Sequence, residues 1–301
     1  MMLQGKAIVI TGSGKGIGAA CARGAARQGA SVVVNDVDDS AHETAAAINA
    51  EGGTAVACVA NVADWDEAGR LIEHCLSNFG GIDGLVNNAA LYYLETLQDF
   101  QPARARGMVE VNVLGPLHCT GHAIGPMLRR GSGSIVNVVS GAQMGMPQMG
   151  VYGATKGAVA SMVYTWALEL AGTGVRVNAL SPFGRTTIGG LTEEHLKDPD
   201  IARRYAQIQP PEANSPVLEY LLSDRASAVN GQLVRIDKGE IHLYTHPALL
   251  LPPVYREQWT AETVADAFES EFRDRQVPCG VLGMTGLPVE LQSGFWKRAD
   301  G

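Results

Sequence analysis

The chain has 301 residues, of which 46% are hydrophobic, 18% are charged and 36 are glycines without a Gly-x-y repeat. This composition excludes a disordered or collagen-like chain and is that of a globular protein large enough to bury its own core. The net charge of −8 disfavours a nucleic-acid partner, and the five widely spaced cysteines, which lack a C-x-x-C pair, predict neither a disulfide framework nor a metal site.

Strand-like and helix-like segments alternate from the N-terminus to about residue 180. Short runs rich in Val and Ile predict buried strands, and alanine-rich or amphipathic segments between them predict helices. This alternation predicts a doubly wound, Rossmann-type α/β fold, a parallel sheet between two helical layers that binds ligands at the carboxyl ends of its strands. The predicted order is strand 6–11, helix 17–28, strand 31–35, helix 40–50, strand 54–59, helix 65–79, strand 84–87, helix 100–129 with a kink at Pro116, strand 134–139, helix 152–171 and strand 175–180.

After Ser181 this alternation stops. The segment 183–213 is polar and irregular around a predicted helix at 193–207, and its length predicts a functional loop beside the substrate. A helix at 215–222 and a last strand at 232–236 complete the sheet domain.

We therefore expect a single domain over residues 1–240 and a C-terminal extension over 241–301. The extension contains an amphipathic helix at 261–272, which we expect to pack on the domain or on a neighbouring subunit, with a substrate lid as the alternative. The N-terminal residues lack a signal-peptide pattern and no apolar stretch is long enough to span a membrane, so we expect a cytoplasmic protein with reduced thiols.

A glycine-rich turn, TGSGKGIG at 11–18, follows the first strand and opens the first helix. Glycines there let the backbone approach a pyrophosphate, whose charge lies at the helix N-terminus. The strand–turn–helix context favours this interpretation over a plain turn. The cofactor-binding residues predicted in the turn are Gly12, Ser13, Lys15, Gly16, Ile17 and Gly18.

Asp36 ends the second strand. A carboxylate there accepts hydrogen bonds from the ribose hydroxyls of a dinucleotide and repels the 2′-phosphate of NADP. A turn or helix-capping role is the alternative, and Lys15 would favour a phosphate, but no arginine follows Asp36. We therefore predict NAD rather than NADP.

Tyr152 and Lys156 are four residues apart, which places both on one face of a helix. A phenol is a poor base at neutral pH, and a nearby ammonium lowers its pKa. Tyr152 could then take the proton of an alcohol, or donate one to a ketone, while Ser140, just past a strand end, holds the substrate oxygen. A solvated helix face is the alternative for the Tyr/Lys pair.

Taken in order, these motifs resemble the classical short-chain dehydrogenases/reductases over about residues 3–240. The resemblance implies that Lys156 also binds the nicotinamide ribose, that Asn112 holds a water in a proton relay, and that the protein is a tetramer or dimer. It adds to the cofactor-binding set Asn61, Val62, Asn88, Ala89, Tyr152, Lys156, Pro182 and Thr186. The motifs are the loop with Thr11, Gly12, Gly16 and Gly18, then Asp36, Asn61-Val62, Asn87-Asn88-Ala89-Ala90, Asn112, Ser140 and Tyr152-x-x-x-Lys156.

The chain departs from the family pattern at three positions. Ala90 replaces a glycine, and Val139 stands where a second serine is common, which leaves Ser140 as the one candidate there. Phe183 replaces the glycine that usually follows Pro182, and we expect its ring to project toward the nicotinamide or the substrate.

The predicted substrate pocket is apolar. Its expected residues are Ser140, Tyr92, Met144, Met146, Met149 and Phe183. Methionine adapts to irregular apolar ligands, although these methionines could instead fill the core or a subunit contact. The set predicts a bulky apolar alcohol or ketone, while Arg185 leaves a carboxylate open.

A looser resemblance, carried by residues 32–36 and 223–232, points to bacterial hydroxysteroid and hydroxyacyl-CoA dehydrogenases of multifunctional type. It favours an NAD(H)-dependent enzyme that interconverts a secondary alcohol and a ketone on a steroid, terpenoid or aromatic compound. The alternatives are a dihydrodiol dehydrogenase that yields a catechol and a dinucleotide-binding regulator without catalysis.

Overall fold

The computed structural model describes residues 1–184, 199, 208–237, 239–247, 249 and 252–275. The chain divides into two compact units, Met1–Ala248 and Leu249–Gly301. Arg185, Thr186 and all of the predicted helix at 193–207 except residue 199 lie outside the described residues.

One sheet organises the first unit. In the described part of the chain it has eight strands in the order β3-β2-β1-β4-β5-β6-β7-β8; the first seven in this order run parallel and β8 is antiparallel to β7. The order reverses between β1 and β4, so the crevice that binds ligands in such sheets opens at the ends of these strands. The strands are β1 Ala7–Ile10, β2 Ser31–Asp36, β3 Thr54–Val59, β4 Gly84–Asn87, β5 Gly133–Val138, β6 Val175–Ser181, β7 Leu233–Asp237 and β8 Glu240–Leu243.

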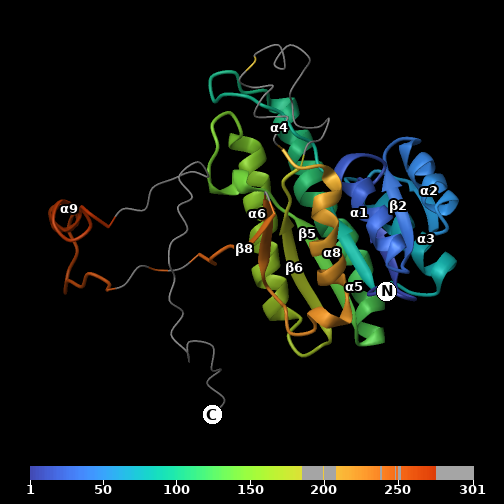
Figure 1. Ribbon diagram of the computed structural model, residues 1–301. Helices are drawn as coiled ribbons and strands as arrows, with labels where there is room; N and C mark the ends of the chain where they lie inside the picture. Colours follow the sequence, from blue (N-terminus) through green and yellow to red (C-terminus); the bar gives the residue numbers. More distant parts are fainter. Residues whose placement is uncertain (185–198, 200–207, 238, 248, 250–251, 276–301) are drawn as a thin grey trace. The chain divides into compact units, whose positions relative to one another are not determined.

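Helices cover both faces of the sheet (Figure 1). Along β1, Ala7 and Val9 belong to one apolar cluster and Ile8 and Ile10 to the other, because side chains alternate across a strand. The first cluster packs α3, α5 and α6 on one face, and the second packs α1, α2 and α8 on the other, which confirms the predicted doubly wound fold. The helices are α1 Gly16–Arg27, α2 Ser40–Ala50, α3 Trp65–Phe79, α4 Pro102–Val109, α5 Gly115–Arg130, α6 Gly150–Glu169 and α8 Ser215–Leu222.

The long helix predicted over 100–129 is instead interrupted by a π-helical turn, Glu110–Leu114, between α4 and α5. In this turn the N–H of Gly115 donates to the carbonyl of Glu110, five residues earlier. Pro116 explains the interruption, because it has no N–H to donate to the carbonyl of Asn112 and its ring crowds that carbonyl. The expected kink is therefore a change of helix type centred on Asn112.

Strand β8 was not predicted, because its four residues, EIHL, are too few to establish an alternating pattern; all four are exposed. The chain after it returns over the sheet unit: the hydroxyl of Tyr244 lies 3.1 Å from Ser181 Oγ, and the ring of His246 lies 4.6 Å from that of Tyr164. Residues 241–246 thus lie within the compact unit Met1–Ala248, and the predicted boundary at residue 240 stays a prediction.

In the C-terminal unit the described residues form one helix, α9 Ala261–Glu269, three residues shorter than predicted. Thr260 caps its N-terminus by accepting a hydrogen bond from Thr263 N, and Thr263 Oγ1 accepts one from Thr260 N. None of the described helices of either unit is both long and apolar enough to cross a membrane. Packing of the extension on the domain or a subunit stays a prediction.

Candidate active site

The glycine loop joins β1 to α1 at the point where the sheet order reverses. Gly12 and Gly16 have φ of +59° and +60°, in the left-handed region. A Cβ on Gly12 would lie 2.6 Å from Ala89 Cα, and one on Gly18 would lie 2.3 Å from the Gly12 carbonyl oxygen. A side chain at either position would displace backbone, so close packing against the end of β4 requires these glycines.

Hydrogen bonds tie this loop to the end of β4. Thr11 Oγ1 accepts from the N–H groups of Asn88 and Ala89, each at 3.0 Å, and Asn88 Nδ2 donates to the carbonyls of Thr11 and Gly12. The first turn of α1 has no capping side chain. Its N–H groups and the glycine backbone together fit a pyrophosphate.

Ser13 and Ile17, both predicted to bind the cofactor, have different surroundings. Ser13 is fully buried, its Oγ donates to the Ile10 carbonyl at 2.7 Å and its N–H donates to Asn35 O at 2.7 Å. Ser13 therefore shapes the loop with its polar atoms instead of offering them to a ligand. Ile17 reaches the segment after β6, since a Cβ on Gly184 would lie 3.5 Å from Ile17 Cδ1.

Asp36 is held at the edge of the same loop. Its Oδ2 accepts from Gly14 N at 3.0 Å and its Oδ1 from Val37 N at 2.8 Å. Lys15 does not pair with Asp36; its ammonium lies 3.2 Å from Asp38 Oδ2. Hydrogen bonds from Ser40, together with Lys15, lower the pKa of Asp38 to about 2. The carboxylates of Asp36 and Asp38 thus outnumber the ammonium of Lys15, and the net charge at the end of β2 is negative.

Asn61 and Val62 follow β3, as predicted. Asn61 is exposed and its N–H donates to Glu67 Oε2 at 2.7 Å. Val62 is buried, and a Cβ on Gly115 would lie 2.9 Å from its Cγ2, so Val62 packs beneath the start of α5.

Tyr152, Lys156 and Ser140 gather at the carboxyl end of β5. Lys156 is 2% exposed, its Nζ donates to the Val138 carbonyl at 2.8 Å and lies 5.7 Å from the centre of the Tyr152 ring. Ser140 begins a short 3₁₀ helix, Gly141–Met144, where its Oγ accepts from Ala142 N at 3.2 Å.

The pKa of Tyr152 differs from the expectation. Burial raises it to about 12, against the lowering effect of a hydrogen bond with Ser140. We expected the ammonium of Lys156 to lower it, but that ammonium is bonded to the Val138 carbonyl and lies over the ring rather than at the hydroxyl. Burial also lowers the pKa of Lys156, to about 8. Desolvation thus dominates this pair, because the low dielectric disfavours both charged forms.

Asn112, in the π-helical turn, is 1% exposed and joins two other elements. Its Oδ1 accepts from Leu91 N at 2.7 Å, and its Nδ2 donates to Leu91 O at 2.9 Å and to Thr155 Oγ1 at 3.1 Å. The asparagine therefore fixes the loop after β4 against α6, the helix that carries Tyr152.

We expect Asn112→Ala to lower the free energy of unfolding by about 2 kcal/mol, since it leaves partly buried backbone groups of Leu91 without partners. Urea unfolding of the purified variants measures this change. Asn61→Ala is the matched control, because that asparagine is exposed and should change stability by less than about 0.5 kcal/mol. Equal effects of the two substitutions would contradict the role of Asn112 in holding the loop after β4 against α6.

The predicted substrate residues lie around this group. The ring of Tyr92 stands edge-on to that of Tyr152, with centres 4.9 Å apart. Met144, Met146 and Met149 are half-buried and belong to neither buried apolar cluster. Met149 also forms a β-bridge with Glu95, which joins the loop before α6 to the loop after β4.

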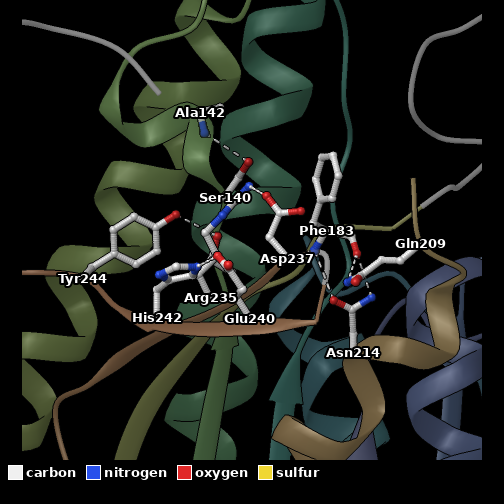
Figure 2. Close-up of polar contacts among 11 residues, drawn as sticks. Ser140, Ala142, Phe183, Gln209, Asn214, Arg235, Asp237, Glu240, His242 and Tyr244 are labelled. Carbon is white, nitrogen blue, oxygen red and sulfur yellow. Dashed lines mark hydrogen bonds and ion pairs between the residues drawn. The ribbon is translucent and has the colours of Figure 1, made fainter. Parts of the chain in front are cut away.

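Phe183 follows Pro182 where the chain leaves β6. Its N–H donates to Asn214 Oδ1 at 3.1 Å, and its carbonyl accepts from Gln209 Nε2 at 2.6 Å and Asn214 Nδ2 at 3.2 Å. Figure 2 shows both amide side chains gathered on the Phe183 backbone. Thr186, predicted beside it, lies outside the described residues.

Sequence reasoning missed Arg235, whose guanidinium carbon lies 5.5 Å from the centre of the Phe183 ring. The available signal was a charge inside an otherwise apolar strand, LVRID. It also missed Tyr244, which follows the unpredicted strand β8.

Comparison with known proteins identifies the family of this chain. Residues 6–193 match the family model of short chain dehydrogenases. The cis-4-hydroxycyclohexanecarboxylate dehydrogenase of Sinomonas cyclohexanicum is 34% identical over 236 residues, covering 77% of this chain and 94% of that protein. The 2,5-dichloro-2,5-cyclohexadiene-1,4-diol dehydrogenase of Sphingobium indicum is 35% identical over 246 residues, covering 79% and 97%.

Among solved structures, a 7α-hydroxysteroid dehydrogenase complexed with NADH and 7-oxo glycochenodeoxycholic acid superposes with a TM-score of 0.72. Its sequence is 30% identical, and the match covers 79% of this chain and 94% of that one. The family model covers more than half of the chain, and the sheet order agrees with it. The protein therefore belongs to the classical short-chain dehydrogenases/reductases, oxidoreductases that act on alcohols and ketones.

Proposed function

We propose that this protein is an NAD(H)-dependent enzyme that interconverts a secondary alcohol and a ketone on a bulky apolar ring compound. The observation that carries the proposal is the grouping of Tyr152, Lys156 and Ser140 at the carboxyl end of β5. The nicotinamide ring, when bound, supplies the hydride acceptor or donor.

In the proposed reaction Ser140 Oγ holds the substrate oxygen and Tyr152 moves the proton. With a pKa near 12, Tyr152 is protonated at neutral pH and suited to donate its proton to a ketone. In the oxidative direction Tyr152 must lose that proton, and the charge of Lys156 stabilises the phenolate. Asn112 acts through the position of α6 and through a proton relay.

The proposed cofactor contacts follow the loop from β1 to β6. The glycine-loop backbone would hold the pyrophosphate, and Asp36 would bind the ribose hydroxyls. Asn61 and Val62 would border the adenine, while Pro182 and Thr186 would hold the nicotinamide amide together with Lys156 on its ribose. The remaining contacts are assigned to Gly12, Lys15, Gly16, Ile17, Gly18, Asn88, Ala89 and Tyr152, while the fully buried Ser13 would shape the loop.

For the cofactor we expect wild-type protein to prefer NADH over NADPH, and Asp36→Ser to reduce this preference by about 10- to 100-fold. The substitution removes the carboxylate that would bind the ribose hydroxyls and repel a 2′-phosphate. The ratio of kcat/KM for the two cofactors measures it. Asp39→Ser is the matched control, since this neighbouring carboxylate makes no capping hydrogen bond. A wild-type preference for NADPH would overturn the assignment.

The substrate class rests on the half-buried apolar side chains of Tyr92, Phe183 and the three methionines. Relatives that act on cyclohexane and steroid rings support it. The test is a screen of steroid, terpenoid and aryl ketones and alcohols with NADH, NADPH and their oxidised forms. Turnover of ring ketones is the expected result, and NADH binding without turnover of any compound would favour a regulator instead.

A dihydrodiol dehydrogenase is the second candidate, favoured by the similarity to a cyclohexadienediol dehydrogenase. Product analysis distinguishes the two, because a dihydrodiol gives a catechol and a simple alcohol gives a ketone.

We also propose a homo-oligomer, dimer or tetramer, because apolar side chains are exposed along α4, the π-helical turn and α5. These side chains are Val109, Leu114, Leu117 and Leu128. Light scattering after size-exclusion chromatography measures the assembly.

A cytoplasmic location is proposed from the free thiols of Cys21, Cys75 and Cys119, whose pKa values burial raises to about 12.

A further inference from the structure

We propose that Arg235 is a positioning residue that holds the ring of Phe183 as a fixed wall of the substrate site. The inference rests on the proposed function, because it assigns a specificity role within that site.

Arg235 lies on β7 next to the strand end that leads into the site. It pairs in register with Ser181, the last residue of β6, two residues before Phe183. Its neighbours Val234 and Ile236 belong to the cluster that packs α1, α2 and α8, while Leu233 belongs to the opposite cluster. Since side chains alternate along a strand, Arg235 faces the side of the sheet covered by α6, which carries Tyr152.

Phe183 is held from two directions. Asn214 and Gln209 bind both polar groups of its backbone, so the chain cannot turn the residue away without losing three hydrogen bonds. The guanidinium carbon of Arg235 lies 5.5 Å from the ring centre, within the range of an attractive cation–π contact. The ring is thereby held on one face, and in the proposed role its other face contacts the substrate.

The guanidinium is itself fixed. Its Nη2 donates to Asp237 Oδ2 at 2.8 Å (Figure 2), and the side chain of Tyr244 acts with Asp237 to raise the pKa of Arg235 against the effect of burial. Tyr244 reaches this position because β8 reverses the chain, and its hydroxyl lies 3.1 Å from Ser181 Oγ. Arg235 is 7% exposed and already paired with a carboxylate, so it supports a ring rather than binding a substrate carboxylate.

A double-mutant cycle distinguishes the positioning role of Arg235 from a purely structural one. In the structural role, the Arg235–Asp237 pair only closes the β7–β8 hairpin. The cycle combines Arg235→Met with Phe183→Ala and measures kcat and KM for the best ring ketone of the screen at saturating NADH. NADH affinity is measured separately by its fluorescence.

We expect Arg235→Met to raise the KM for the ketone roughly tenfold, with kcat and NADH affinity changed less than about twofold. In the Phe183→Ala background the same substitution should leave KM unchanged, because the ring it positions is gone. Arg235→Lys keeps the charge without the planar fork and should give an intermediate KM. If Arg235→Met fails to fold, Arg235→Lys carries the cycle in both backgrounds.

Arg176→Met is the matched control. Arg176 is a half-buried arginine at the opposite end of β6, where it donates to the carbonyls of Leu221, Ser223 and Val229. It should lower the midpoint of thermal unfolding without changing KM. Equal increases of KM in both Phe183 backgrounds, or a KM unchanged by Arg235→Met or Arg235→Lys, would overturn the inference while leaving the proposed function intact. A wild-type protein without turnover would overturn both.

Discussion

Tyr152→Phe is expected to lower kcat by roughly 10²- to 10⁴-fold, because it removes the hydroxyl that moves the proton. The phenyl ring keeps its edge-on contact with Tyr92, at 4.9 Å between ring centres, so the shape of the site and the affinity for NADH should be retained. Steady-state turnover of the best ring ketone and a fluorescence titration with NADH measure the two quantities.

Tyr92→Phe is the control for this experiment, since it removes the hydroxyl of the neighbouring tyrosine. Because Tyr92 is assigned to the substrate wall and not to proton transfer, its loss should change kcat by only a few-fold. Turnover that is undiminished in Tyr152→Phe would refute the assignment of the proton donor.

Lys156→Met is expected to abolish turnover and to raise the free energy of unfolding at pH 7 by about 2 kcal/mol. Burial that lowers the pKa of a lysine from 10.5 to about 8 corresponds to about 3 kcal/mol of unfavourable free energy in the charged state. The Val138 carbonyl loses its donor in the variant, which offsets about 1 kcal/mol of the gain.

The stability gain expected for Lys156→Met depends on pH. Between pH 8 and 10.5 the unfolded chain carries the lysine proton and the folded protein does not, so the stability of the wild type rises with pH over this range. The advantage of Lys156→Met should therefore shrink from pH 7 to pH 10.5. Urea unfolding at the two pH values measures it, with Lys15→Met as an exposed control. A variant less stable than the wild type at pH 7 would contradict the desolvation of Lys156.

The strand and helix order of the sheet domain was predictable because each element carries its own periodic pattern. The Val-rich runs are buried on both faces, as expected for parallel strands, and Gly12 and Gly16 of the glycine loop have the positive φ that such a turn requires. Strand β8 has only four residues, all of them exposed, and the π-helical turn depends on how Pro116 and Asn112 meet neighbouring elements. These two features therefore escaped prediction.

In the candidate site, the positions of the key residues along the chain were predictable, but their contacts were not. Spacing alone put Tyr152 and Lys156 on one helix and Ser140 after a strand, and these roles stay predictions until the variants are measured. The partners of these residues could not be predicted from the sequence: Lys15 pairs with Asp38, and Asn112 hydrogen-bonds to Leu91. The pairing of Phe183 with Arg235 joins residues 52 positions apart.

By itself the sequence of this protein determined the fold family, the position of the glycine loop and the residue types available for proton transfer. These properties depend on local spacing and on side-chain periodicity, which neighbouring residues set. Only the tertiary structure decided the raised pKa of Tyr152, the lowered pKa of Lys156 and the fixed ring of Phe183. Each of these depends on how completely water is excluded and on which distant side chain arrives, and both follow from packing of the whole sheet domain.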